Sequence, residues 1–191
     1  MFLPQIAQCN IYKELTLELL RMNFETIRER RCAISLNLNL TDLLDDDIYH
    51  TIHNRLGEAQ SDARLCTFEL LEEEQITDLP LLQSRIASLR ALGATISIDD
   101  FGTGYSNFTH LFALDIDVIK IDGSLIRDIH TSEVSRKLVE SIVAFARASG
   151  KRITAEFIHS AEVLEHVRSL GITHGQGFYL GKPAPLPDAA A

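Results

Sequence analysis

The feature that most restricts the fold is an alternation of short apolar runs with amphipathic segments. The apolar runs have the length of strands, and the segments between them have the apolar period of a helix, beginning with residues 12–30. Three of these segments stop at a glycine (Gly93, Gly150 and Gly171), a residue that commonly ends a helix. Such alternation predicts a parallel sheet with right-handed crossovers, either a doubly wound sheet or a (β/α) barrel. The predicted strands are residues 33–38, 65–70, 94–98, 118–121, 152–157 and 172–178.

Nearly every predicted strand ends in a polar side chain. In a (β/α) barrel, groups from many strand ends converge on one mouth, whereas an open sheet gathers its ligand at one switch point. The chain therefore favours an α/β fold of the TIM-type (β/α) barrel class. A closed barrel needs about eight strands and usually ~200 residues or more, so we expect an incomplete barrel in one domain, residues 1–185, followed by a disordered tail, 186–191. The polar residues at the strand ends are Asn37, Asn39, Glu69, Asp99, Asp100, Lys120, Asp122, Glu156 and Gln176.

The net charge of −9 argues against unspecific binding of DNA or RNA polymers and of anionic membranes, because no basic stripe is present to neutralise phosphates. No apolar stretch approaches the ~18 residues of a membrane span, and no signal peptide is recognisable. We expect a cytoplasmic protein without direct membrane contact, whose three cysteines (Cys9, Cys32 and Cys66) are reduced. A small phosphate ligand would need positive charge from elsewhere, and metal ions are the obvious source.

Two adjacent aspartates, Asp99 and Asp100, follow the apolar run 94–98 and precede Phe101-Gly-Thr-Gly. Carboxylate and amide oxygens suit a hard cation such as Mg²⁺ or Mn²⁺, and two such ions can promote displacement at a phosphodiester. In a regular strand the two side chains would point to opposite faces, so both reach the mouth only if the strand ends or bulges there. The glycines after Phe101 supply such a break. Taken alone, the pair is equally compatible with a solvated turn.

Lys120 alternates with apolar neighbours and would point into a barrel interior, where an unpaired ammonium is costly. We therefore expect a carboxylate, a phosphate or a nucleophilic water beside it. Other candidates are weaker when taken singly: Glu69 belongs to an acidic run, and His159 and His174 are single histidines, which are more often structural than metal-ligating. Only the joint arrangement of polar strand ends indicates a functional site.

Together these motifs resemble the EAL-domain phosphodiesterases, which hydrolyse cyclic di-GMP. The most diagnostic pair of motifs in that family is similar, in order and spacing, to IDDFGTGYSN followed by VIKID. Its asparagine-bearing strand resembles ISLNLN, its glutamate strands resemble FELLEE and TAEF, and its closing glutamine motif resembles GQGFYLGKPAP. The resemblance extends from about Phe2 to Pro185.

The resemblance implies hydrolysis of cyclic di-GMP to linear pGpG with two Mg²⁺ or Mn²⁺ ions, and inhibition by Ca²⁺. It implies that Lys120 holds or helps to deprotonate the attacking water, and that Glu156 completes the surroundings of the second metal. Gln176 would support substrate or water, and Glu72 would fix the loop after Asp100 that governs the second metal and dimer coupling. The implied metal ligands are Asn37, Glu69, Asp99 and Asp100. The implied substrate-binding residues are Asp122, Gln176, Gly177, Phe178 and Pro183.

The sequence departs from the family pattern in two places. The Glu-Ala-Leu triplet that names the family is absent, and the nearest string, Glu58-Ala59-Gln60, falls between a predicted helix and a predicted strand. Family members carry that glutamate, a metal ligand, on a strand preceding the segment with which this chain starts. The second departure is AEFIH, which puts Phe157 and His159 where glycine and glutamate are usual.

These departures leave alternatives open. The resemblance predicts an N-terminally truncated EAL domain from a larger multidomain signalling protein, with turnover impaired by the missing glutamate. The alternatives are a noncatalytic cyclic di-GMP receptor or protein-interaction module and, less consistent with the motifs, a phosphodiesterase of other substrate range. A truncated barrel also exposes strand edges, so we expect a homodimer or a larger assembly.

Overall fold

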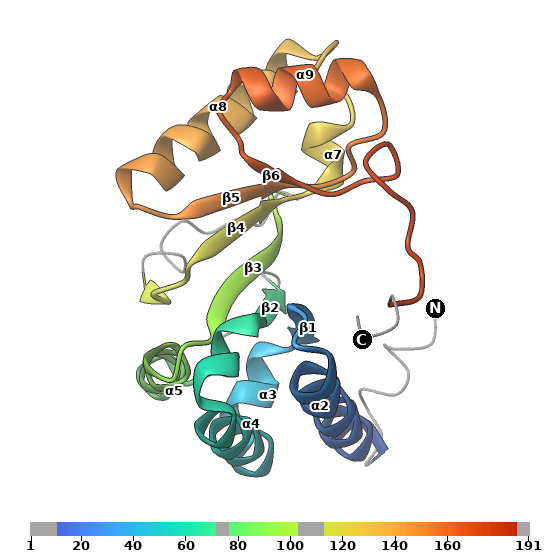
Figure 1. Cartoon of the computed structure of the whole chain (residues 1–191). Helices are drawn as coiled ribbons and strands as arrows, with labels where there is room; N and C mark the ends of the chain where they lie inside the picture. The colour runs from blue at the N-terminus through green and yellow to red at the C-terminus, as the bar shows by residue number, and fades with distance from the viewer. Residues whose placement is uncertain (1–10, 72–76, 103–112, 187–191) are drawn as a thin grey trace. The chain divides into compact units, whose positions relative to one another are not determined.

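The computed structural model describes residues 11–71, 77–102 and 113–186. The strands, labelled as in Figure 1, are β1 (Ile34–Leu38), β2 (Cys66–Leu71), β3 (Thr95–Phe101), β4 (Val118–Ile121), β5 (Arg152–Ala155) and β6 (His174–Gly175). The helices are α2 (Ile11–Arg30), α3 (Leu40–Leu44), α4 (Asp46–Ala59), the 3-10 helix η1 (Gln60–Leu65), α5 (Leu79–Ala91), α7 (Gly123–Ile126), α8 (Glu133–Ala148) and α9 (Ala161–Ser169).

The strands follow one another in chain order from β1 to β6, and the pairs β3–β4, β4–β5 and β5–β6 are parallel. A doubly wound sheet would instead reverse its strand order at a switch point. The predicted (β/α) architecture of the TIM-barrel class is therefore confirmed. All predicted strands are present, although β5 stops at Ala155 and β6 contains only two residues.

The early end of β6 has a local cause. The backbone at Gly177 lies so close to Ile158 that a side chain at Gly177 would overlap the Ile158 backbone. The amide of Tyr179 then donates to the carbonyl of Ile158 (3.1 Å), and the amide of Leu180 donates to Gly177 (3.0 Å). These bonds turn the chain away from the strand direction that the apolar pattern predicted.

The described residues fall into two compact units, residues 11–69 with 77–95, and residues 70–71 with 96–102 and 113–186. In the first unit, α4 packs against α2, α3 and α5. The helices bury one face each, with Leu20, Phe24 and Ile27 of α2 and Ile48, Ile52 and Leu56 of α4 among the buried residues. This unit also carries β1 and most of β2.

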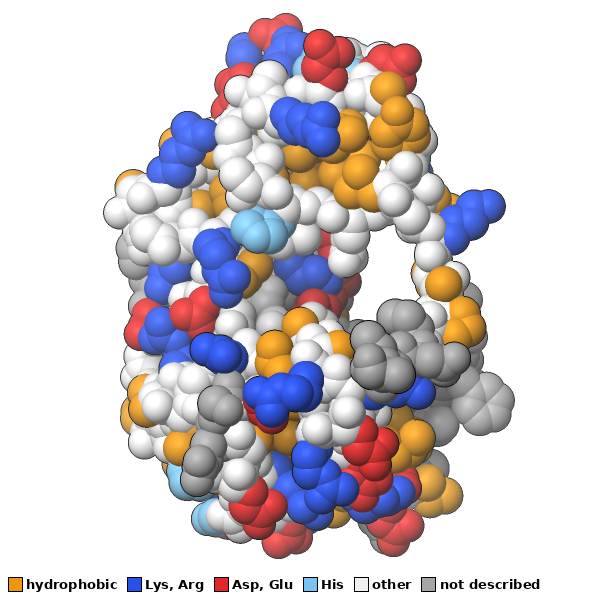
Figure 2. All heavy atoms as spheres, in the orientation of Figure 1, with side chains coloured by type: hydrophobic (Ala, Val, Ile, Leu, Met, Phe, Trp, Pro, Cys, Tyr) orange, Lys and Arg blue, Asp and Glu red, His pale blue; other side chains and the backbone are white. Residues whose placement is uncertain are grey.

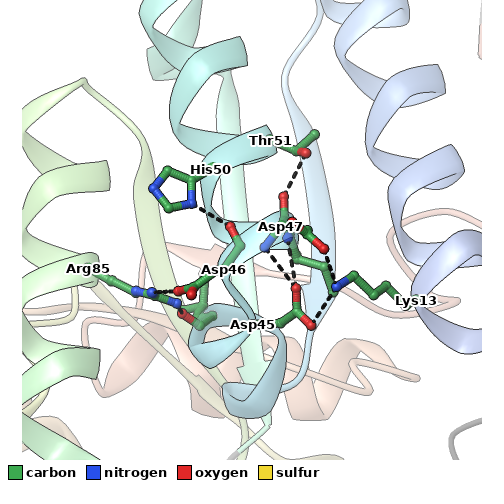
Figure 3. Close-up of polar contacts among 9 residues, drawn as sticks. Lys13, Asp45, Asp46, Asp47, His50, Thr51 and Arg85 are labelled. Atoms are coloured by element: carbon green, nitrogen blue, oxygen red, sulfur yellow. Dashed lines mark hydrogen bonds and ion pairs between the residues drawn. The ribbon is translucent and has the colours of Figure 1, made fainter.

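Arg85 of α5 joins three elements of the first unit (Figure 3). It is 7% exposed, donates to the carbonyl of Leu43 over 2.8 Å and forms an ion pair with Asp46 at the start of α4. Its guanidinium also lies 4.5 Å from the ring centroid of Tyr49. Because a guanidinium can donate in several directions and stack on a ring, one side chain holds the end of α3 and the start of α4 against α5.

Lys13 makes a second polar connection in the same unit, from α2 to the start of α4 (Figure 3). Its Nζ lies 2.9 Å from Asp45 and 2.6 Å from Asp47. Asp45 also accepts from the amides of Asp47 (2.9 Å) and Ile48 (3.1 Å), which lack partners within the first turn of the helix. Asp45 therefore caps α4, and both aspartates attach it to α2.

The second unit contains β3 to β6, with α7, α8 and α9 together on one side of β4 and β5 (Figure 1). α8 and α9 are capped at their starts by Ser132 and Ser160, whose side chains accept from the amides of Ser135 and Val163. Gly93 in the first unit, like Gly150 and Gly171 here, has a positive φ, which explains why glycine ends these helices.

Acidic and basic side chains are interspersed over the face shown in Figure 2. Among the described helices, none combines the length and apolarity needed to cross a membrane. Cys32 and Cys66 are free thiols, as expected, and Cys9 lies outside the described residues.

Candidate metal centre

The end of β3 brings Asp99 and Asp100 into one cluster. The register with β4 shifts between Ile98 and Phe101, which marks a bulge, and Asp100 has a φ of 54°. Asp tolerates this left-handed conformation better than most residues. The bulge cancels the alternation that would send the two carboxylates to opposite faces. The predicted break in the strand is therefore confirmed, and Asp100 itself takes the unusual conformation.

Strand register places Lys120 and Glu156 beside Asp99. Lys120 of β4 pairs with Thr154 of β5. Glu156 comes two residues after Thr154, so its side chain points to the same side as those of Thr154 and Lys120. The Nζ of Lys120 lies 2.7 Å from Asp99 Oδ1 and 2.9 Å from Glu156 Oε1. Lys120 is only 6% exposed. The prediction that this lysine needs an oxygen partner is confirmed, and the partners are two carboxylates.

Gln176 reaches the same cluster from the end of β6. Its amide nitrogen donates to the carbonyl of Ala155 (2.9 Å), which continues the pairing of β6 with β5. Its side-chain Nε2 donates to Glu156 Oε1 over 2.6 Å. One oxygen of Glu156 therefore accepts from both Lys120 and Gln176. The side chain of Glu156 is oriented by residues of the two strands that flank its own.

Asp99, Asp100 and Glu156 each offer one carboxylate oxygen, and the three oxygens lie within 4.8 Å of one another. Burial raises the pKa of Asp100 above its ordinary value, and the nearby charges of Asp99 and Asp122 raise it further. Burial also raises the pKa of Glu156, although its hydrogen bond to Lys120 opposes the rise. Crowded carboxylates that resist ionisation fit a divalent cation, which would neutralise them, and an all-oxygen set fits Mg²⁺ or Mn²⁺.

Asp122 follows β4 and caps α7, where its Oδ1 accepts from the amide of Ser124 (2.8 Å). Its charge still acts on Asp100. The sequence indicated that Asp122 lies near the cluster, because it is two residues after Lys120 and the two side chains share a side in an extended chain. Asp122 thus contributes to the electrostatics of the carboxylate cluster, and its predicted contact with substrate stays a prediction.

Asn37 and Glu69 belong to the first unit. Asn37 alternates in β1 with buried Leu36 and Leu38, and Glu69 alternates in β2 with buried Phe68 and Leu70, so both side chains point away from the apolar side of their strands. Their role as metal ligands stays a prediction. Within the second unit, the described residues that the structure brings together are Asp99, Asp100, Lys120, Glu156 and Gln176.

The remaining predicted site residues are either outside the described residues or not among the residues that contact this cluster. Glu72 lies outside the described residues. Phe178 is 70% exposed and Pro183 is exposed, and with Gly177 they belong to the chain that leaves β6. His159 and His174 are exposed and lie outside the one carboxylate group that, among the described residues, could hold a metal ion.

The model of the EAL domain family matches residues 1–183. The cyclic di-GMP phosphodiesterase PdeF of Escherichia coli (strain K12) is 31% identical to this chain, over 98% of this chain and 26% of its own length. The curated relatives extend well beyond the match, since this chain spans about a quarter of the length of PdeF and of the probable cyclic di-GMP phosphodiesterase PdeA from the same strain.

Solved structures show the same fold. An EAL domain protein from Listeria monocytogenes EGD-e, at 24% identity, supports the fold alone, with a TM-score of 0.86 over 96% of this chain and 74% of that one. Klebsiella pneumoniae BlrP1, solved with manganese and cyclic di-GMP, is 28% identical, with a TM-score of 0.76 over 87% of this chain and 43% of that one. With its sequence motifs, strand order and carboxylate cluster, this chain belongs to the EAL domain family.

Proposed function

We propose that this chain binds cyclic di-GMP and hydrolyses one of its phosphodiester bonds to give linear pGpG. The observation that carries the proposal is the cluster of Asp99, Asp100 and Glu156 bridged by Lys120, at the C-terminal ends of parallel strands. This is the end of a (β/α) barrel at which active sites are built. The relative PdeF is named a cyclic di-GMP phosphodiesterase, and the similar BlrP1 was solved with that dinucleotide.

In this proposal Asp99, Asp100 and Glu156 hold Mg²⁺ or Mn²⁺, assisted by Asn37 and Glu69. Ions bound by these residues would supply an activated water and would stabilise charge on the departing oxygen. BlrP1 complexes with manganese and with calcium support divalent cations as a class. Ca²⁺ is expected to inhibit, since it accepts longer and less regular coordination than Mg²⁺ or Mn²⁺.

The chain's own residues supply orientation and charge. Lys120 fixes Asp99 and Glu156 through contacts of 2.7 and 2.9 Å and brings a cation to a site that must accept an anionic phosphodiester. Gln176 fixes the oxygen of Glu156 that Lys120 also contacts. Lys120 is also the group proposed to hold the attacking water or assist its deprotonation. Addition of that water across one P–O bond yields one phosphomonoester and one hydroxyl, which opens the ring.

We propose that turnover by the 191-residue chain is slow, because its sequence contains no Glu-Ala-Leu triplet and thus lacks one ligand of the family's metal pair. The same feature favours the second candidate function, a cyclic di-GMP receptor without catalysis. Separation of the reaction mixture by ion-exchange chromatography distinguishes them. Slow, Mn²⁺-dependent pGpG formation that disappears in Lys120→Met supports the enzyme, whereas binding without any pGpG supports the receptor.

The relatives are much longer than the segment that matches this chain, which supports a role for this domain within a longer protein. We propose that it works within a larger cytoplasmic signalling protein of a bacterium and that it self-associates. Light scattering tests the second statement, since a strictly monomeric protein over the micromolar range would contradict it.

A further inference from the structure

Phe157 directly follows Glu156 and has an unusual conformation. Its φ is 54°, a left-handed value that is rare for a bulky residue and costs conformational energy. Its side chain is nevertheless 46% exposed. The apolar pattern predicted that β5 would continue through Phe157, but the strand stops at Ala155. A strained backbone that presents a large aromatic ring to solvent is not explained by packing alone.

Phe157 is held by Gly123 of α7, by Arg127 at the C-terminal end of α7, and by His159. A side chain at Gly123, the first residue of α7, would approach the Cβ of Phe157 to 2.8 Å, so the base of Phe157 lies directly against this helix. The guanidinium carbon of Arg127 lies 4.6 Å from the ring centroid. The imidazole of His159 lies 5.5 Å away, centroid to centroid, and is tilted by 48°. Phe157 is therefore positioned and half-exposed, with a cation beside its ring.

An exposed aromatic ring next to a guanidinium is the combination on which nucleobases stack. Arg127 adds positive charge, which favours an anionic nucleotide in a chain whose net charge is −9. Phe157 is also the residue directly after Glu156, one of the three clustered carboxylates. We propose that Phe157 and Arg127 form a stacking platform for one guanine base of the cyclic dinucleotide, an inference that rests on the proposed function.

The chain contains no tryptophan, so a single introduced indole reports on this position. Phe157→Trp should show fluorescence quenching when GMP or cyclic di-GMP is added, because a stacked base contacts the indole. Inorganic phosphate should cause no quenching, since it offers charge without a ring. The matched control is Leu138→Trp on α8, where the native side chain is 48% exposed, and its emission should not respond to any of the three compounds.

Affinity gives an independent readout by calorimetry. Phe157→Gly removes the ring and suits the left-handed backbone, and it should weaken cyclic di-GMP binding about 5- to 100-fold, the range for loss of one stacked base. Phe157→Tyr keeps the ring and should bind within about twofold of wild type. Circular dichroism should show unchanged helix content in all variants.

The outcomes separate the platform from the proposed function. If wild-type protein binds cyclic di-GMP but Phe157→Gly binds it equally well, or Phe157→Trp is not quenched, the platform is wrong. Quenching by inorganic phosphate equal to that by GMP would also overturn it. If wild-type protein binds no cyclic di-GMP, the proposed function fails, and the GMP titration of Phe157→Trp then decides the platform by itself.

Discussion

Lys120 donates from its Nζ to Asp99 Oδ1 over 2.7 Å, across 21 residues of sequence. The same ammonium contacts Glu156, and the side chains of all three residues are at most 15% exposed. In the metal-free protein, Lys120 thus balances two carboxylates that are both largely shielded from water. This balance makes Lys120 important for stability as well as for the proposed reaction.

Replacing Lys120 by methionine should lower the free energy of unfolding of metal-free protein by about 3 kcal/mol, because the partners of a buried ion pair are left uncompensated. Urea denaturation in EDTA measures this, and Mn²⁺ should recover part of the loss by neutralising the carboxylates. Lys137→Met, which breaks an exposed pair with Glu133, should change stability by less than about 0.5 kcal/mol. Equal losses in the two variants would contradict the assignment.

Asp100→Asn should stabilise the metal-free protein at pH 7 and weaken Mn²⁺ binding. Burial and neighbouring carboxylates raise the pKa of Asp100, so its stabilising contribution is present below its ordinary pKa and is lost as pH rises through the folded value. Asparagine keeps the left-handed backbone without the charge. We expect a thermal midpoint about 2–4 °C higher at pH 7, the effect of about 1 kcal/mol in a chain of this size.

The gain from Asp100→Asn should shrink as pH falls and vanish below the ordinary pKa of an aspartate, where Asp100 is protonated in both the folded and the unfolded wild type. Asp115→Asn, at an exposed side chain paired with Lys151, serves as the control and should leave both the midpoint and Mn²⁺ affinity nearly unchanged. A lower midpoint for Asp100→Asn at pH 7 would mean that the carboxylate cluster is not repulsive.

Arg85→Lys should destabilise the protein almost as much as Arg85→Met, by about 2–4 kcal/mol in urea denaturation. Lysine keeps the charge but cannot donate simultaneously to Leu43 and Asp46 while stacking on Tyr49. Full rescue by lysine would show that charge alone matters. Because Arg85 is not one of the proposed metal ligands, the Mn²⁺ affinity of the folded variants should match wild type.

The two described cysteines should differ in reactivity. Cys66 is fully buried, and burial raises the pKa of its thiol to about 12, whereas Cys32 is half-buried. In a Cys9→Ser background at pH 8, mass spectrometry should find iodoacetamide on Cys32 only, and on both thiols after unfolding in urea. Equal rates of alkylation of Cys32 and Cys66 in the folded protein would contradict the burial of Cys66 in β2.

Local pattern was enough to predict much of this molecule. The apolar runs gave the strands, the glycines after helices gave their ends, and the glycine after Phe101 indicated the break that brings Asp99 and Asp100 together. The need of Lys120 for an oxygen partner followed from its apolar neighbours alone. These features depend on residues close together in sequence, for which period and turn chemistry are informative.

Features that depend on distant partners were not predictable from such patterns. The contact of Gln176 with Glu156 follows from the register of β6 against β5, and the connections made by Arg85 reach residues about forty positions earlier. The left-handed conformation of Phe157 ends β5 early in a stretch whose apolar pattern favours a strand. Tertiary contacts decide such positions, so propensity alone misses them.

We propose that the carboxylate cluster binds a divalent cation through which the chain holds cyclic di-GMP. Calorimetric titration of cyclic di-GMP with Mn²⁺ and with EDTA, for wild type and for the Asp99→Asn, Asp100→Asn double variant, tests this most directly. We expect micromolar binding with Mn²⁺ for wild type, weakened at least about tenfold by EDTA or by the double substitution. Equal affinity with and without metal, or no binding under either condition, would contradict it.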